Sequence, residues 1–227
     1  MDGPDCAQPQ PRSALSRSRI ARAGVELADT EGLAAVSMRK VAERLGAGTM
    51  SLYRHVASRD ELIALMVEEV YAGVSGTVRT DDWRQGLGHA AHQIRATVTS
   101  HPWLAGRSVP RLGLGPSLLG MLESTLALLD GYGLTVDEML DVLGTIQAFV
   151  QGYVLEELAE QGASRATGLT KSGVQQRQES RVREIAASGR YPQFVRVVTE
   201  AEDDPDADRV FERRLYYVLD GLAPIFR

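Results

Sequence analysis

The chain has 227 residues, 44% of them hydrophobic, which is enough to bury one large core or two modest ones and argues against a disordered protein. Its single cysteine excludes an intramolecular disulfide and a cysteine-based zinc site. Neither a signal-peptide core near Met1 nor an 18-residue uncharged run is present, so the sequence predicts a cytoplasmic protein with no membrane partner.

The net charge of −5 is unevenly distributed along the chain. Between Arg12 and Arg59 there are nine Lys and Arg against four Asp and Glu, whereas the remaining residues have 16 against 26. A basic N-terminal module on an acidic remainder is typical of a small DNA-binding head on a body that does not bind DNA.

The chain opens with a stretch that lacks helical periodicity. Residues 1–15 contain three prolines, which predicts a mobile tail. The first helix is expected over residues 16–30, where apolar side chains recur at helical spacing and Gly32 follows as a stop signal.

Two short helices joined by a tight turn are expected between Ser37 and Val56. Apolar residues at i, i+3, i+4 and i+7 from Met38 give the first helix one buried face, and Gly46 can end it in the left-handed conformation. A second helix over about 49–56 is short enough to enter the major groove of DNA, and its exposed side carries polar groups and an aromatic ring. The stretch therefore predicts a helix-turn-helix whose recognition helix spans about 49–56.

A further helix is expected to connect this module to the rest of the chain. It spans about 58–75 and begins with a capping box formed by Ser58 and Glu61. The expected domains are a DNA-binding domain over 16–75 and a larger helical domain for ligand binding and dimerisation over 76–227.

The remainder shows helical periodicity and no alternating segment of any length, so we predict an all-α protein. A flexible loop is expected over 162–173, which is rich in Gly, Ser, Thr and Ala. Helices are expected over 83–100, 117–131, 136–161, 174–188, 192–203 and 207–226.

The helices over 136–161 and 207–226 are apolar over more than one face. Such breadth indicates burial on two sides, either in a four-helix bundle with a second chain or by central packing within one chain. For the bundle, the expected dimer contacts are Ile146, Val150, Phe211, Leu215, Val218 and Leu222.

The segment Gly48–Leu62, the helix Met38–Gly46 and the first-helix ending Ala28–Leu33 resemble the tetracycline-repressor (TetR) family of bacterial transcription regulators. A weaker likeness to the tetracycline-repressor branch itself extends through the body. The resemblance implies an all-helical homodimer that reads a palindromic operator in double-stranded DNA and is released from it by a small-molecule inducer.

The same resemblance assigns DNA contacts to this chain. Arg54 is the expected guanine reader, and Arg39 and Arg59 can bind phosphates. The alternatives are that Tyr53 and His55 close the core of the head and that Met50 is only a surface residue. The expected DNA-binding residues are Ser37, Arg39, Lys40, Thr49, Met50, Ser51, Tyr53, Arg54, His55 and Arg59.

The expected inducer differs from tetracycline. By alignment with tetracycline repressors, Ser108 or Val109 stands where those proteins have a metal-binding histidine, which removes a ligand of the magnesium–tetracycline complex. An apolar pocket with one arginine suggests a hydrophobic, anionic or polyphenolic molecule instead. The expected pocket residues are Ile94, Thr97, His101, Trp103, Arg107, Met121, Leu122, Thr125, Phe149 and Tyr153.

Other functional classes are less well supported by the sequence. His89 and His92 share a helix face and could form a metal site with His101, but surface or capping roles are favoured, so no metal or cofactor is expected. No catalytic motif is present, which argues against an enzyme. The alternative to a ligand-responsive repressor is an inducer-independent DNA-binding protein of structural or corepressor type.

Overall fold

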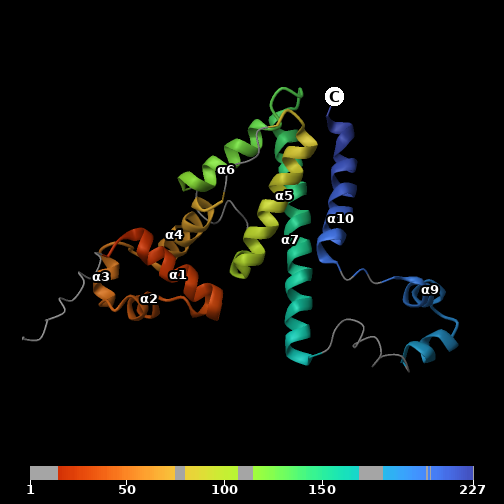
Figure 1. Cartoon of the computed structure of the whole chain (residues 1–227), viewed down its shortest axis with the longest axis horizontal. Helices are drawn as coiled ribbons and strands as arrows, with labels where there is room; N and C mark the ends of the chain where they lie inside the picture. Colours follow the sequence, from red (N-terminus) through yellow and green to blue (C-terminus); the bar gives the residue numbers. More distant parts are fainter. Residues whose placement is uncertain are drawn as a thin grey trace, which may run out of the picture. The chain divides into compact units, whose positions relative to one another are not determined.

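The computed structural model describes residues 15–74, 80–106, 115–168, 181–202, 204 and 206–226, and in these residues every regular element is a helix (Figure 1). The all-α prediction is confirmed. The chain divides into two compact units: residues 1–73 with 109–118, called the head below, and residues 74–108 with 119–227, called the body. Each unit is considered by itself.

The head is built from four α-helices and one short 3-10 helix. Each of three serines caps the helix that follows it: the hydroxyls of Ser16, Ser37 and Ser58 accept hydrogen bonds from the first turns of α1, α2 and α4. The elements are α1 (Arg17–Glu31), η1 (Leu33–Ala35), α2 (Met38–Leu45), α3 (Thr49–Tyr53) and α4 (Arg59–Ala72).

The core of the head forms where α1 packs closely against α4. A Cβ atom at Gly24 of α1 would lie 2.7 Å from the sulfur of Met66 on α4, so only glycine allows this approach. Three buried residues of α2, Met38, Val41 and Ala42, and one of α3, Leu52, complete the core. The short helices α2 and α3 are therefore held by tertiary packing, because helices of eight and five residues are not stable alone.

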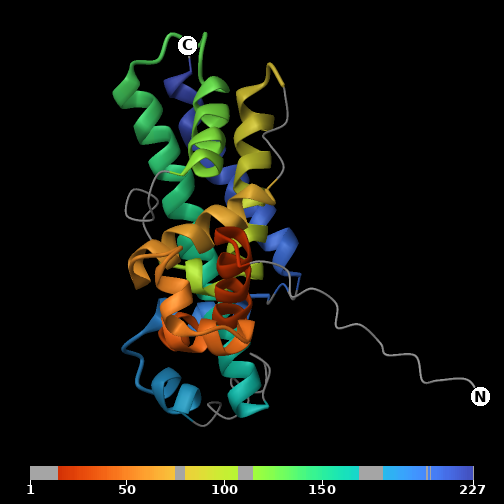
Figure 2. The ribbon, with the colours of Figure 1, turned by 90° about the vertical axis from the view of Figure 1, so that its left-hand side faces the viewer.

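The body is organised around α7 (Val136–Thr167), which packs against α5 (Trp83–Ser100) and α10 (Ala207–Leu222). In Figure 1, α7 lies between the other two helices, and in Figure 2 α7 and α10 again lie side by side. The other described elements are η2 (Pro102–Leu104), α6 (Pro116–Ala127), which is divided between the two units after Leu118, α9 (Pro192–Glu200) and η4 (Ala223–Ile225).

The start of α5 is fixed by an aromatic cluster. The ring of Trp83 stacks on that of Phe226 with centroids 3.8 Å apart and an angle of 3° between the planes. The hydroxyl of Tyr132 donates a hydrogen bond to the carbonyl oxygen of Asp81 and accepts one from the backbone N–H of Trp83. These contacts join the first turn of α5 to the loop before α7 and to the segment after α10.

Several helix limits differ from those expected. The helix predicted over 49–56 ends at Tyr53, and Arg54 forms its C-cap. The loop prediction over 162–173 is wrong for residues 162–167, which continue α7. The Ala and Ser residues of this segment are compatible with a helix, and Gly168 ends the helix in the left-handed conformation. Residues 169–173 lie outside the described part of the chain.

Three further helices also end earlier than expected. The helix predicted over 117–131 ends at Ala127, and that over 192–203 ends at Glu200. The last α-helix ends at Leu222, where Pro224 favours a tighter 3-10 turn. Of the helix predicted over 174–188, residues 181–187 are described and are helical.

A charged and aromatic cluster joins α5, α7 and α10. The guanidinium of Arg95 on α5 donates to both carboxylate oxygens of Glu157 on α7, at 3.2 and 3.0 Å, and to Asp208 on α10 at 2.7 Å. It also lies 4.7 Å from the ring centroid of Phe211. Because the side chains of Arg95 and Glu157 are only 12% and 15% exposed, removing either partner would leave the other as a largely buried charge without its counterion.

Replacing Arg95 with alanine should lower the free energy of unfolding by about 3 kcal/mol, since Glu157 would keep a buried charge with no cation beside it. The loss can be measured by urea denaturation, and adding Glu157→Gln should recover part of it. Arg214→Ala is the matched control because Arg214 pairs with Glu156 at the surface, and it should cost no more than about 0.5 kcal/mol. Equal losses in the two variants would show that burial of the Arg95 pair does not matter.

Candidate nucleic-acid interface

The recognition helix α3 presents most of its side chains outward. Only Leu52 is buried, while Met50 and Tyr53 are 77% and 45% exposed. An apolar side chain as exposed as Met50 has no packing role in the head. The exposure of Tyr53 likewise disagrees with the alternative that its ring closes the core.

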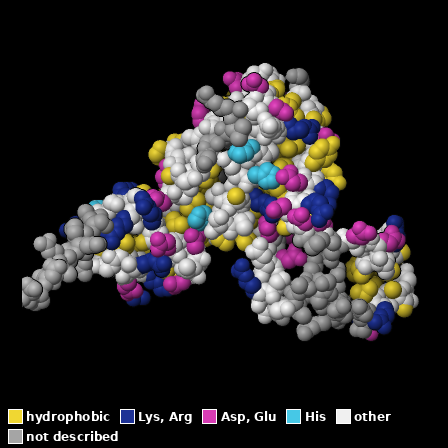
Figure 3. Space-filling view, viewed as in Figure 1, with side chains coloured by type: hydrophobic (Ala, Val, Ile, Leu, Met, Phe, Trp, Pro, Cys, Tyr) yellow, Lys and Arg dark blue, Asp and Glu magenta, His cyan; other side chains and the backbone are white. Residues whose placement is uncertain are grey.

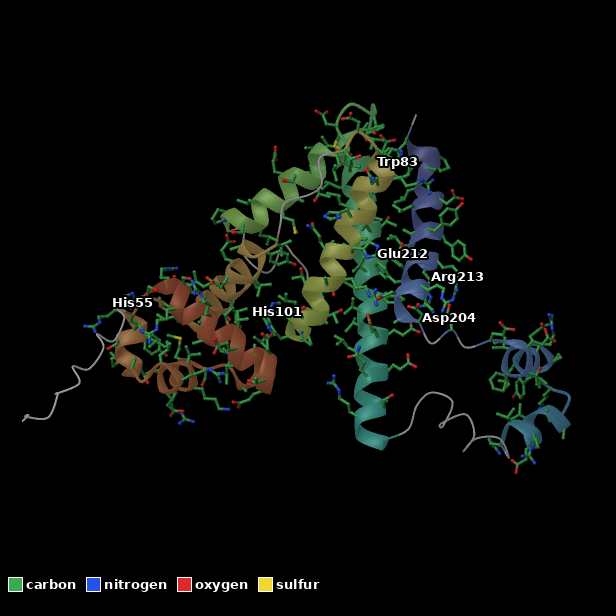
Figure 4. All side chains as sticks on the ribbon, viewed as in Figure 1. His55, Trp83, His101, Asp204, Glu212 and Arg213 are labelled. Carbon is green, nitrogen blue, oxygen red and sulfur yellow. The ribbon has the colours of Figure 1, made fainter. Side chains whose placement is uncertain are left out.

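The end of α3 carries two further candidates for DNA contact. Arg54 is exposed, and its guanidinium donates to the hydroxyl of Ser51 at 3.2 Å, which directs it along the outer side of the helix. His55 is half-buried and follows directly, at the end of α3 (Figure 4). Thr49 is half-buried at the first turn. The structure therefore brings these residues together with Met50 and Tyr53 on one short segment.

The helix α2, which precedes α3 in the chain, carries basic side chains that are accessible to solvent. Arg39 pairs with Glu43 at 2.6 Å, and Lys40 pairs with Glu31 at 2.6 Å, both at the surface. Surface pairs of this kind contribute little, so phosphate groups can replace the carboxylates at small cost. Ser37 is the N-cap of α2, where its hydroxyl accepts from the backbone N–H of Lys40. Figure 3 shows basic and acidic side chains interspersed over the head.

Arg59 has an internal role that the sequence did not indicate. Its Nε donates to the carbonyl oxygen of Val36 and its Nη2 to that of Leu33, each at 2.9 Å. These bonds tie the first residue of α4 to the segment that leads into α2. Only Nη1 has no described bond, so Arg59 offers less to a phosphate than the exposed Arg39 does.

Arg17 and Glu61 were not among the expected site residues. The Arg17 guanidinium donates to the carbonyl oxygen of His55 at 2.9 Å and to Glu61 at 2.5 Å. The backbone N–H of Ala57, first, and Arg17, second, lower the pKa of Glu61. The two residues are 44 positions apart in the sequence, so no local pattern could have paired them.

The residues expected to line a ligand pocket make several different contacts within the body. Trp103 is buried and its ring lies at an angle to that of His101, with centroids 6.3 Å apart. Phe149 and Tyr153 instead contact Phe211 of α10, at centroid distances of 5.5 and 5.0 Å. The half-buried members of the predicted set are Ile94, Thr97, His101, Met121, Leu122, Thr125 and Phe149, and Arg107 lies outside the described residues.

Two of these half-buried residues have their hydroxyls bonded within their own helices. Thr97 donates to the carbonyl oxygen of Gln93, and Thr125 donates to that of Met121, each at 2.8 Å. Tyr153 donates to the carbonyl oxygen of Ala207 at 2.6 Å. Tyr153 therefore helps to fix the start of α10, a role that its position on an apolar helix did not reveal.

The side chains expected at the dimer contact pack inside one chain, which corrects that prediction. Phe211 and Val150 are fully buried, and Ile146, Leu215 and Leu222 are between 2% and 7% exposed, because α5, α7 and α10 enclose them. Val218 is half-buried. Burial within one chain, the other explanation of these broad apolar helices, accounts for five of the six residues.

The remaining predictions concern metals and membranes. His92 pairs with Glu212 at 2.8 Å, and both belong to the body (Figure 4). Within the described residues no three His, Cys, Asp or Glu side chains are grouped so that they could hold a metal ion. In the same part of the chain, no helix is both long and apolar enough to cross a membrane.

Comparison with known proteins accounts for both units. Residues 20–66 match the family described as bacterial regulatory proteins, tetR family, and residues 76–225 match the tetracyclin repressor-like C-terminal domain. The HTH-type transcriptional repressor DrrR1 of Streptomyces coeruleorubidus is 37% identical over 214 residues, which cover 93% of this chain and 78% of that protein. The tetracycline repressor protein class A from transposon 1721 of Escherichia coli is 29% identical over 216 residues, covering 92% and 91%.

Solved structures agree with these sequence matches. The crystal structure of ActR from Streptomyces coelicolor in complex with actinorhodin has a TM-score of 0.75 and 26% sequence identity, and the match covers 93% of this chain and 96% of ActR. The matched families and relatives are DNA-binding transcription regulators and not enzymes. The chain therefore belongs to the TetR family of bacterial transcription regulators.

Proposed function

We propose that this protein is a ligand-responsive repressor that binds a palindromic operator as a homodimer and is released by a small hydrophobic inducer. The observation that carries the proposal is the exposure of the recognition helix: Met50, Tyr53 and Arg54 are exposed, and Leu52 is the one residue of α3 that is buried in the core. An exposed aromatic ring and a guanidinium on a helix this short suit contacts with base edges and phosphates in the major groove. The ten DNA contacts expected from the sequence remain part of this proposal.

Dimerisation is supported by apolar side chains that the body leaves exposed. On α7, Leu140 and Leu155 are 54% and 46% exposed, and on α10, Tyr216 and Tyr217 are 58% and 63% exposed. On α7, the exposed residues Gly144, Ala148 and Gly152 recur at spacings of four between the two leucines, so all five follow one side of the helix. We place the dimer contact on this outer side of α7 and on the exposed tyrosines of α10.

The proposed inducer is a polycyclic aromatic molecule. ActR, the relative crystallised with actinorhodin, matches 93% of this chain, which supports a ligand of that chemical class. Trp103 is buried, and Ile94 of α5 with Met121 and Leu122 of α6 are half-buried apolar residues, as such a ligand requires. The histidine expected of a magnesium–tetracycline site has no counterpart at Ser108 or Val109, so tetracycline should not induce.

Fluorescence of Trp103 provides the test. In a Trp83→Phe variant, in which Trp103 is the one remaining tryptophan of the chain, actinorhodin should quench the emission saturably and should release the protein from DNA over the same concentration range. Tetracycline with magnesium should do neither. Trp83 is a suitable site for the silent change because it stacks on Phe226 at the opposite end of α5 from Trp103.

The alternative function predicts a different result. An inducer-independent DNA-binding protein should keep its affinity for DNA with every polycyclic aromatic compound tested, even when the compound quenches Trp103. Quenching without release would therefore contradict the proposed repressor and leave DNA binding itself intact.

A further inference from the structure

The recognition helix needs support at its C-terminal end. It has five residues and one buried anchor, Leu52, and so short a helix cannot maintain its own orientation. Its last carbonyl groups also have no partner further along the helix. Arg54, the expected guanine reader, lies at this end, so any movement there would displace a side chain that reads DNA.

Two side chains from other helices hold this end. Arg17, the first residue of α1, donates through Nη1 to the carbonyl oxygen of His55 at 2.9 Å and through Nη2 to Oε1 of Glu61 at 2.5 Å. Oε2 of Glu61 accepts from the backbone N–H of Ala57 at 2.6 Å. One ion pair thus bonds to the backbone at two points of the turn between α3 and α4.

The geometry suits orientation better than it suits stability. The side chains of Arg17 and Glu61 are 53% and 33% exposed, and ion pairs so exposed contribute little to the free energy of folding. A guanidinium, however, presents its donors in a fixed planar fork, so two simultaneous bonds define a direction. The Ala57 N–H, first, and Arg17, second, lower the pKa of Glu61, so this carboxylate stays charged to a lower pH than an ordinary glutamate does.

We propose that Arg17 and Glu61 form a brace that positions the recognition helix and increases DNA affinity without touching DNA. This inference rests on the proposed DNA-binding function. The competing explanation is that Arg17 binds a phosphate, as an arginine near the N-terminus of a DNA-binding domain often does, and that Glu61 is incidental.

The two explanations predict opposite changes in DNA affinity when Glu61 is replaced with glutamine. If Arg17 binds phosphate, Glu61→Gln removes a negative charge near DNA and frees Arg17, so the affinity should rise. If the pair is a brace, the same change removes the carboxylate that orients Arg17, so the affinity should fall by about tenfold, the loss expected for one charge-assisted hydrogen bond. Glutamine can still accept from the Ala57 N–H, so the helix start is preserved.

The salt dependence of binding gives an independent measurement. The probe is the DNA duplex recovered by selection from a random library with the wild-type protein. The slope of log K against log salt concentration is negative, and loss of one phosphate contact should reduce its magnitude by about 0.9. Arg17→Lys, which keeps the charge but not the fork, should lower the affinity about fivefold. Arg17→Ala, which removes the charge, should lower the affinity with an unchanged slope, whereas Arg39→Ala should make the slope less steep.

Controls separate the brace from misfolding and from failure of the proposed function. The thermal unfolding midpoint and the helix content of each variant should match those of the wild type at the temperature of the binding assay. Arg17→Ala combined with Glu61→Gln should lose no more affinity than Arg17→Ala alone, since the two residues act as a unit.

Three results would overturn the brace: unchanged or increased affinity in Glu61→Gln, wild-type affinity in Arg17→Lys, or a less steep salt slope in Arg17→Ala. If the wild type selects no duplex at all, the proposed DNA-binding function fails, and that failure is distinct from failure of the brace.

Discussion

Replacing both Tyr53 and Arg54 with alanine should lower the affinity for the selected duplex at least about 100-fold, which amounts to loss of binding in a mobility-shift assay at physiological salt. Both side chains are exposed on the recognition segment, so their removal takes away contacts with DNA without opening a cavity in the head. A good base contact is worth about 1 to 3 kcal/mol, and two such losses combine to this effect.

The matched control is Arg22→Ala. Arg22 lies on α1 and pairs with Glu69 of α4 at the surface, so it carries the same charge but belongs to the α1–α4 side of the head. Its loss should change the affinity no more than about twofold. Wild-type affinity in the double variant would contradict the assignment of α3 as the recognition helix, whatever the result for Arg22→Ala.

Replacing Leu155 and Tyr217 with glutamate should convert the proposed homodimer into folded monomers, as measured by size-exclusion chromatography with light scattering. The two side chains are 46% and 63% exposed in the single chain, so a charge there costs the monomer little but would be buried in the proposed contact. Loss of the second head should lower the apparent DNA affinity at least about 100-fold, because two linked heads bind the operator with a high effective concentration.

Leu215→Glu distinguishes this contact from the one expected from the sequence. Leu215 is 2% exposed and packs within the chain, so a charge at this position should unfold the body and not produce folded monomers. A persistent dimer in the Leu155 and Tyr217 variant would move the contact to another surface. Folded monomers in Leu215→Glu would restore the contact predicted from the sequence.

The helical elements could be predicted because their signals are local. Ser58 caps the helix that the sequence assigned to it, and Gly46 adopts the left-handed conformation predicted for the end of α2. Ser37 and Thr135, which cap α2 and α7, are also residue types that favour this position. The error at residues 162–167 also has a local origin. Gly162 and the small residues after it suggested a loop, but a long helix already stabilised by packing continues through them at small cost.

The contacts between helices could not be predicted in the same way. The broad apolar character of α10 predicted burial on two sides, but within the chain its buried side chains form a single stripe and Tyr216 and Tyr217 are exposed. Nor could that pattern say whether Phe211 meets a second chain or α5 and α7 of its own. Similarly, the sequence predicted a phosphate contact for Arg59 and assigned no role to Arg17. Their bonds to distant carbonyl groups follow from the packing of α1 and α4, which no spacing in the sequence encodes.

Because α3 contributes a single side chain, Leu52, to the core, nearly all of its outer positions are free from the demands of folding. Substitutions at Thr49, Met50, Tyr53 and Arg54 should change which DNA sequence is read at little cost in stability. Duplicated copies of this gene could therefore acquire new operators in few mutational steps, while the body retains its ligand. For the same reason, a library randomised at these four positions is the natural starting point for redirecting the protein to a chosen promoter.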